Sequence, residues 1–389
     1  MRIALIQDDI FLPSFGGGTK ANRCLLEGLA QHGHECHAFA RALTRSSDGP
    51  RTVAEFAAEM AGRGTAFRER EPGVFAYRNA GVEVEALDLA DADAQRDYLA
   101  RRLRVLDPDW IFVTDDKRRI MLQAAMAAAP TRVILLLQTI IQLPFGPLAV
   151  ERNADYARLV GATRAIIVIS RFMQDYIRVH GGLDATLLPL PVYGPGPFPD
   201  LGSFEHGYVT MINPCALKGV SIFMGLARAL PDIPFAAVPT WGADAALLEQ
   251  LRELPNVTLL APSNDIEDIL GRTRVLLAPS LWPETFGYVV PEAMLRGIPV
   301  LASNVGGLPE AKLGVDYVLP VVPGQFRPDG FVAPPQDLAP WEQALRGLLA
   351  DADTYRRCAR ESRQAAQAFV STVSVTPFET LLDRLAEVR

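Results

Sequence analysis

The sequence contains two successive series in which short apolar runs alternate with amphipathic patterns of helical period. Apolar runs such as 2–7 are typical of buried parallel strands, and the intervening patterns are typical of helices that cover them. A proline-dense segment, residues 189–199, separates the two series. It cannot be a helix interior or a central strand, so we expect a stiff linker. The pattern predicts an α/β fold of two doubly wound, Rossmann-like domains that face each other across a cleft.

The two series give definite expectations for the elements. Strands are expected over 2–7, 35–40, 110–114, 131–137 and 165–169, and then over 208–212, 234–238, 257–260, 275–278 and 299–302. Helices are expected over 23–31, 94–106, 120–129, 219–230, 243–251, 266–271, 291–296, 341–370 and 378–388. We therefore predict an N-terminal domain over 1–192 and a C-terminal domain over 193–371. The C-terminal helix, about 372–389, is a candidate to pack back on the first domain.

Composition and charge narrow the class of protein. The 389 residues are 49% hydrophobic and 21% charged, which allows a large core and argues against disorder. The net charge of -7 argues against nucleic acid as the main partner. Four scattered cysteines predict reduced thiols, and the apolar start of the chain is too short for a signal peptide. No run reaches the roughly 20 residues of a membrane span, so we expect a cytoplasmic protein; peripheral membrane contact stays open.

A glycine-rich segment, Gly16-Gly17-Gly18-Thr19-Lys20, follows the first strand. Three glycines let the backbone approach a ligand closely, and a helix N-terminus behind them favours an anion. The segment is neither a Walker A loop nor a G-x-G-x-x-G fingerprint. It predicts either an anion-binding loop or a flexible turn between strand and helix.

Between a strand and a helix of the second series lies Asn213-Pro-Cys-Ala-Leu-Lys218-Gly219. A lysine there lies near the carboxyl end of the strand and the start of the helix, where it could hold a phosphate as a point charge. A solvated lysine is the alternative.

Further on, Pro279 to Met294 contains two glutamates, Glu284 in a loop after a strand and Glu292 in the first turn of a helix. Their carboxylates could accept sugar hydroxyls on either side of the backbone N–H groups of 286–288. An ordinary surface carboxylate and helix-dipole complementarity are the alternatives.

These residues resemble a known family. Glu284 and Glu292 are similar to the E-x7-E motif of the GT-B-fold retaining glycosyltransferases of glycosyltransferase family 4, and the similarity continues through Glu310. The resemblance implies that Glu292 holds the nucleotide ribose and Glu284 the donor sugar, with Glu284 and Lys218 as catalytic residues. It also implies that Lys218 and the amides of Gly16, Gly17, Gly18, Phe286, Gly287 and Tyr288 hold the diphosphate.

The sequence departs from the family pattern at two places. Asn213 stands where the family usually has an arginine before the lysine, and Gln138 stands where it often has a histidine. Asn213 is retained as a donor-binding candidate, while Gln138, Thr139 and Phe145 are candidates for sugar or acceptor contact. A glutamine can form hydrogen bonds but does not titrate near neutral pH.

The resemblance implies transfer of a sugar from a nucleoside diphosphate sugar to an acceptor hydroxyl, with retention of configuration. The partners would be that donor and an acceptor, which we expect to be a small molecule or glycan. The donor is a co-substrate, and no cofactor or metal is expected. A same-fold epimerase or phosphorylase and a catalytically silent sugar-nucleotide binding protein remain alternatives.

A metal site at His32, His34, Cys36 and His37 is disfavoured, because these residues flank a helix end and a strand start.

Overall fold

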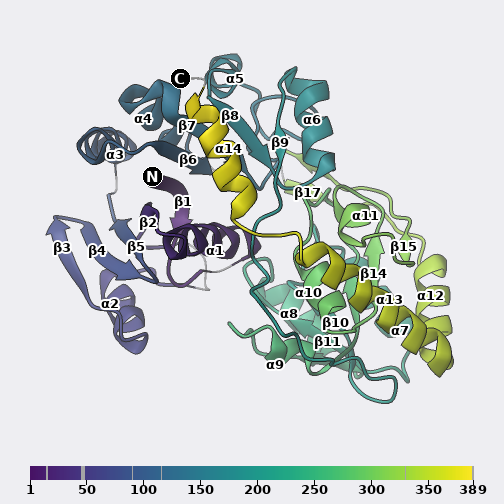
Figure 1. Cartoon of the computed structure of the whole chain (residues 1–389). Helices are drawn as coiled ribbons and strands as arrows, with labels where there is room; N and C mark the ends of the chain where they lie inside the picture. The colour runs from purple at the N-terminus through teal and green to yellow at the C-terminus, as the bar shows by residue number, and fades with distance from the viewer. Residues whose placement is uncertain (15, 45–48, 90, 115, 329, 388–389) are drawn as a thin grey trace. The chain divides into compact units, whose positions relative to one another are not determined.

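The computed structural model describes residues 1–389 except 15, 45–48, 90, 115, 329 and 388–389. The chain forms two compact units (Figure 1). Unit 1 comprises Met1–Val192 and Val373–Arg389, and unit 2 comprises Tyr193–Thr372. The chain passes from unit 1 to unit 2 within the proline-dense segment, which contains neither helix nor strand.

Unit 1 contains a nine-stranded sheet in the order β3-β4-β5-β2-β1-β6-β7-β8-β9. From β5 to β9 every neighbouring pair is parallel. The central strands β6 and β7 are buried along their whole length, as their continuous apolar sequences predict. The strands are β1 Arg2–Ile10, β2 Glu35–Arg41, β3 Phe67–Glu71, β4 Val74–Asn79, β5 Val82–Leu87, β6 Trp110–Thr114, β7 Val133–Leu137, β8 Ala165–Val168 and β9 Thr186–Leu187.

Several helices of unit 1 begin at side chains that cap them. Asp91, Asn153 and Ser170 each accept hydrogen bonds from backbone N–H groups of the first turn of α3, α5 and α6. The helices are α1 Gly17–Gln31, α2 Val53–Gly62, α3 Ala92–Leu106, α4 Met121–Ala128, α5 Ala154–Gly161, α6 Arg171–Gly181 and α14 Thr376–Glu387, with a 3-10 turn at Pro130–Arg132.

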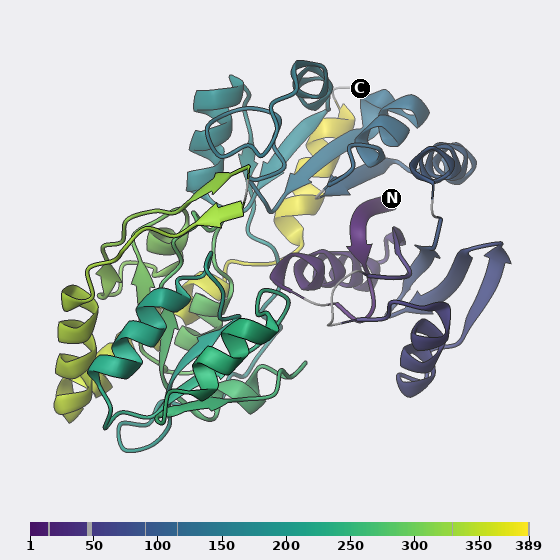
Figure 2. The same cartoon turned by 180° about the vertical axis from the view of Figure 1, so that it is seen from behind.

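The C-terminal helix α14 lies against unit 1, beside β7 and β8 (Figures 1 and 2). Glu379 accepts from His32 at 3.0 Å and from His34 at 2.9 Å, and Arg164 donates to the carbonyl of Leu385 at 3.2 Å. The two histidines therefore hold the returning helix.

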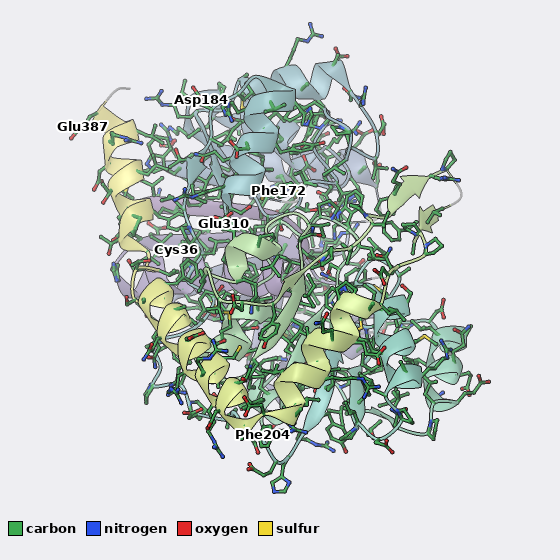
Figure 3. All side chains as sticks on the ribbon, turned by 90° about the vertical axis from the view of Figure 1, so that its right-hand side faces the viewer. Cys36, Phe172, Asp184, Phe204, Glu310 and Glu387 are labelled. Atoms are coloured by element: carbon green, nitrogen blue, oxygen red, sulfur yellow. The ribbon has the colours of Figure 1, made fainter. Side chains whose placement is uncertain are left out.

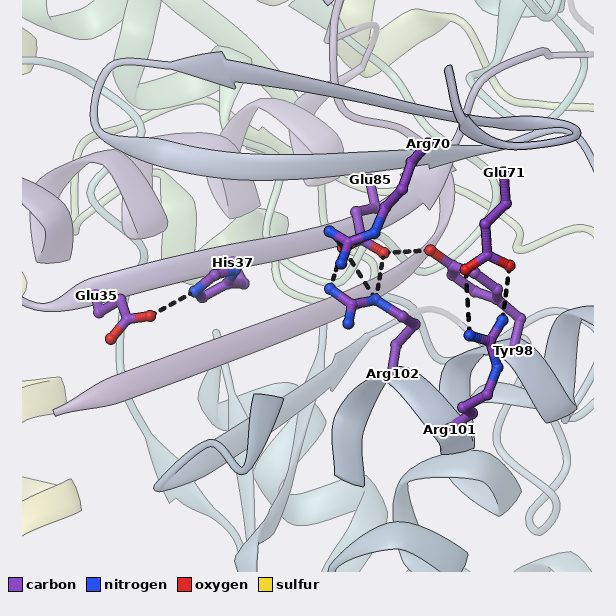
Figure 4. A network of polar contacts seen from close by, with 8 residues as sticks. All are labelled: Glu35, His37, Arg70, Glu71, Glu85, Tyr98, Arg101 and Arg102. Carbon is purple, nitrogen blue, oxygen red and sulfur yellow. Dashed lines mark hydrogen bonds and ion pairs between the residues drawn. The ribbon is translucent and has the colours of Figure 1, made fainter. Parts of the chain in front are cut away.

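The parallel sheet of unit 1 has one antiparallel edge, which the sequence analysis did not predict. β3, β4 and β5 form an antiparallel meander. A charge network around the buried carboxylate of Glu85 fastens this edge to α3 (Figure 4). The carboxylate pairs with Arg102 at 2.5 Å and with the exposed Arg70 at 3.1 Å, and Tyr98 donates to it. Burial raises the pKa of Glu85, but the bonds from Arg102 and Tyr98 outweigh it and the pKa lies below its ordinary value. Every charge of the network has a partner, so no buried charge is left uncompensated at this edge.

The first helix also begins earlier than expected. α1 starts at Gly17 rather than near Arg23, and Gly16, with φ of 82°, is its N-cap residue. Gly17 and Gly18 therefore form the first turn of the helix rather than a loop in front of it. Their N–H groups belong to the set that has no acceptor within a helix.

Unit 2 contains a parallel six-stranded sheet in the order β12-β11-β10-β13-β14-β15 and a separate antiparallel hairpin of β16 and β17. Its strands are β10 Tyr208–Ile212, β11 Phe235–Val238, β12 Val257–Leu259, β13 Thr273–Ala278, β14 Val300–Ser303, β15 Val318–Leu319, β16 Gln325–Arg327 and β17 Gly330–Val332. Its helices are α7 Val220–Ala229, α8 Ala245–Arg252, α9 Glu267–Leu270, α10 Val289–Leu295, α11 Leu308–Ala311, α12 Ala339–Ala350 and α13 Ala352–Val370. The predicted α/β fold with parallel sheets is confirmed. The hairpin was not predicted.

Candidate functional site

The C-terminal candidates gather at the carboxyl ends of two adjacent strands of unit 2. β10 pairs with β11 on one side and with β13 on the other, so the connections leave β10 and β13 in opposite directions. In open α/β sheets a ligand crevice forms at such a switch point. Lys218 follows β10, and Glu284 follows β13.

Lys218 and Glu284 are in direct contact. The ammonium of Lys218 lies 2.5 Å from Oε1 of Glu284, and the hydroxyl of Ser280 donates to the same oxygen at 2.7 Å. The side chains are 30% and 16% exposed, so solvent screens the pair only in part. Among the described residues nothing donates to Oε2 of Glu284, which leaves this oxygen as an acceptor for a ligand hydroxyl.

Backbone contacts hold the two loops that carry this pair. The N–H groups of Leu281 and Trp282 donate to the carbonyl of Leu217 at 2.9 and 3.1 Å. Gly219 has a φ of 79°, and a Cβ there would collide with the carbonyl oxygen of Pro279. Only glycine permits this close approach, so the geometry of the pair is built into the backbone.

Residues 303–310 hold the loop that carries Glu284. Gly307 donates its N–H to the carbonyl of Glu284 at 2.7 Å, and a Cβ on Gly306 would collide with the backbone of Glu284. Ser303, fully buried at the end of β14, donates to the carbonyl of Ser280 at 2.7 Å. Glu310 follows on the short helix α11 (Figure 3). The glycine pair therefore shapes the Glu284 loop.

The segment 286–288 leads from this loop into α10. Gly287 has a φ of 95°, and its N–H has no acceptor among the described residues. Glu292 lies in the first turn of α10, where a carboxylate complements the helix dipole. α10 begins at Val289, two residues before the expected start, and its third residue, Pro291, is tolerated there because N–H groups of the first turn lack helical acceptors.

Tyr193, the first residue of unit 2, packs on this segment. Its ring centroid lies 6.3 Å from that of Tyr288 and 6.1 Å from that of Phe369. Burial raises the pKa of Tyr193 well above its ordinary value, with the nearby Tyr288 and Glu292 contributing in the same direction. Sequence reasoning did not identify this residue.

Asn213 lies at the site, but its side-chain oxygen serves the fold. The residue is 6% exposed with a φ of 60°, and Oδ1 accepts from the N–H of Gly242 at 3.0 Å. This bond fixes the loop after β11 against the turn that carries Lys218. Nδ2 is buried and has no partner within the described part of the chain.

The N-terminal candidates lie in unit 1. Gln138 is 7% exposed and donates to Oδ1 of Asn22 at 2.5 Å and to the carbonyl of Gly18 at 3.2 Å. Gln138 therefore fixes the first turn of α1. Thr139 follows it, half-buried. The backbone carbonyl of Phe145 accepts from the hydroxyl of Tyr176 at 3.2 Å.

Sequence reasoning missed three further contributors to the site: Ser280, Ser303 and Leu217. The only signal at Ser280 is a hydroxyl residue directly after a strand.

The structure shows no group of three or more His, Cys, Asp or Glu side chains placed to hold a metal ion, as far as its residues are described. Over the same residues, no helix has the length and apolarity needed to cross a bilayer.

The contact at Ser280 leads to a prediction. In Ser280→Ala, Glu284 loses one hydrogen bond and keeps Lys218, so we expect about fivefold weaker binding of a sugar-bearing donor, from a bond of about 1 kcal/mol. Isothermal titration would measure it. Ser263→Ala removes a comparable hydroxyl bond to Asp268 outside the site and is the matched control. Equal affinity in wild type and Ser280→Ala would contradict the assignment of Glu284 to the sugar.

Known proteins resemble this chain in sequence and in fold. Residues 211–351 match the family model described as glycosyl transferases group 1. Two curated relatives are an exopolysaccharide phosphotransferase of Streptomyces coelicolor, 25% identical over 77% of this chain and 31% of that protein, and a glycogen synthase of Mycobacterium tuberculosis, 36% identical over 56% of this chain and 53% of that protein. The chain therefore spans about a third to a half of the length of these two relatives.

Solved structures extend the likeness to the whole chain. Sucrose-phosphate synthase of Thermosynechococcus elongatus superposes with a TM-score of 0.71 over all of both chains, at 17% identity. Anabaena HepE, in complex with UDP-glucose, superposes with a TM-score of 0.65 over 99% of this chain and 98% of that one, at 16% identity. Residues 211–351 are thus similar to the glycosyl transferases group 1 family, in a chain that has the fold of the GT-B glycosyltransferases.

Proposed function

We propose that the chain is a retaining glycosyltransferase of the family 4 type, which moves a sugar from a nucleoside diphosphate sugar to an acceptor hydroxyl. The observation that carries the proposal is the contact between Lys218 and Glu284 at the switch point of the matched domain. It puts a cation for a diphosphate next to a carboxylate for sugar hydroxyls.

Each group has a separate task in this reaction. Lys218 and the N–H of Gly287 stabilise the negative charge that builds on the leaving diphosphate. Glu284 accepts hydroxyls of the donor sugar through Oε2, and Glu292 accepts those of the ribose. The binding of UDP-glucose by Anabaena HepE supports a donor of this class.

We assign Glu284 to binding of the donor sugar and not to covalent attack, with Lys218 and Ser280 holding its Oε1. We therefore propose attack from the face of the leaving group. The acceptor oxygen bonds to the anomeric carbon as its bond to the diphosphate breaks, and a diphosphate oxygen takes the acceptor proton. Configuration is retained, and no metal takes part in this scheme.

The donor assignment is tested by thermal shift with UDP, ADP, GDP and dTDP, followed by turnover of the matching sugar nucleotide. A ligand that binds the folded state raises the melting temperature. We expect one nucleotide to do so, and its sugar conjugate to yield a glycosylated small molecule or glycan. A free epimer or a sugar phosphate without transfer product would instead indicate an epimerase or a phosphorylase. Binding with no turnover of any kind would indicate a silent sugar-nucleotide binding protein.

A further inference from the structure

The hairpin of β16 and β17 packs on the loop that carries Glu284. Phe326 of β16 and Phe331 of β17 are direct cross-strand partners, with ring centroids 5.3 Å apart. Trp282 packs on both, edge to face, at 4.9 Å from Phe326 and 6.2 Å from Phe331. We call Trp282, Phe326 and Phe331 the aromatic cluster. It joins the hairpin to a residue two positions before Glu284.

Backbone bonds join the same parts. Gly324, at the base of the hairpin, donates its N–H to the carbonyl of Leu281 at 2.8 Å. Leu281 and Trp282 in turn donate to the carbonyl of Leu217, next to Lys218. A two-stranded hairpin has little stability of its own, so this packing orders the hairpin and the loop together.

The connection from Trp282 to Glu284 is short and stiff. Pro283 stands between them, and its ring fixes one of the two backbone torsions of that residue. A change in the position of Trp282 is therefore passed on to the Glu284 carboxylate. Among the described residues, the side chains of Lys218 and Ser280 hold this carboxylate, both at Oε1. Lys218, by contrast, lies in a turn closed by its own bonds, from its N–H to the carbonyl of Cys215 and from the N–H of Gly219 to that of Ala216.

We propose that the aromatic cluster positions Glu284 toward the donor sugar, so that the hairpin is a positioning element for the sugar half of the donor and not for its diphosphate. The inference rests on the proposed function. It gives Phe326 and Phe331, which lie more than 40 residues after Glu284 in the sequence, a specific role in donor selection.

The test compares binding of a nucleotide with binding of its sugar conjugate, on the full-length chain. The probes are UDP and UDP-glucose, ADP and ADP-glucose, and GDP and GDP-mannose, used in the pair that wild type binds. In Phe331→Leu and Phe326→Leu we expect affinity for the sugar nucleotide to fall about fivefold or more, with affinity for the nucleotide alone within about twofold. Phe326→Tyr keeps the ring and should restore wild-type binding.

Val332→Ala is the matched control, because Val332 lies on the same hairpin, is 37% exposed and stands outside the aromatic cluster. Thermal melts check that each variant folds, and Phe326→Leu, at a side chain 39% exposed, carries the test if Phe331→Leu does not fold. Equal loss for nucleotide and sugar nucleotide, or loss for neither, would overturn the positioning role. A wild-type protein that binds none of the three pairs, nor dTDP and dTDP-glucose, would overturn the proposed function itself.

Discussion

Lys218→Met is expected to lower turnover of the sugar nucleotide by about two to three orders of magnitude. Among the described residues, Lys218 is the one side chain at the switch point that places a positive charge beside Glu284. Loss of a group that stabilises charge in the transition state typically lowers turnover by this amount. The substitution also leaves the Glu284 carboxylate without its cation, so that it repels a diphosphate. Steady-state rates with the donor identified by thermal shift would measure the loss.

Arg252→Met is the control for Lys218→Met, since it removes an exposed cation of unit 2 that pairs with Glu249 on the same helix. We expect it to leave turnover unchanged. The double substitution Lys218→Met with Glu284→Gln should cost less transition-state free energy than the sum of the costs of the two single substitutions. Each single substitution leaves the other residue with an unpaired charge, and the double substitution leaves none. Turnover of Lys218→Met within about twofold of wild type would remove Lys218 from the mechanism.

Lys312→Met is expected to change how the free energy of unfolding depends on pH. Lys312 is fully buried at the end of α11 and donates to the carbonyl of Val300 at 2.6 Å. Burial lowers the pKa of its ammonium from 10.5 to about 8, against the opposing influence of Cys358 and Asp316. Below pH 8 the lysine is charged in both states, and the folded state bears the full cost of burying the charge.

Between pH 8 and 10.5 the unfolded chain still binds the proton and the folded chain does not. The free energy of unfolding of wild type therefore rises with pH across this window relative to Lys312→Met, by about 3 kcal/mol in total. Urea unfolding of both proteins at pH 7, 9 and 10 would measure this rise. Lys312→Leu should give the same slope, and a pH-independent difference would contradict the assignment.

The alternation of apolar and amphipathic segments was enough to predict both sheets, because a strand buried on both faces needs a continuous apolar run. The meander at the edge of unit 1 escaped notice because β3, Phe67–Glu71, is largely charged. Glu71 of β3 pairs with Arg101, and Arg70 of β3 pairs with Glu85; only the folded chain brings these partners together. Edge strands do not obey the burial rule from which the other strands were predicted.

At the candidate site, too, the sequence predicted some features and only the folded chain shows the others. The residue types of Lys218 and Glu284 pointed to a diphosphate and a sugar, but their contact joins positions 66 residues apart. Ser280 and the aromatic cluster had no chemical signature of their own. They act through the packing of loops, which depends on glycines at 219, 306 and 307 that each admit a close backbone approach.

The return of α14 to unit 1 has a consequence for biosynthesis. Unit 2 is one uninterrupted stretch, Tyr193–Thr372, whereas unit 1 is complete only when Val373–Arg389 has been added. Because domains fold as units while the ribosome elongates the chain, unit 2 can finish folding before unit 1 has received its last helix. Until then the surface of unit 1 that α14 covers is open to chaperones, and unit 1 is the last part of the molecule to mature.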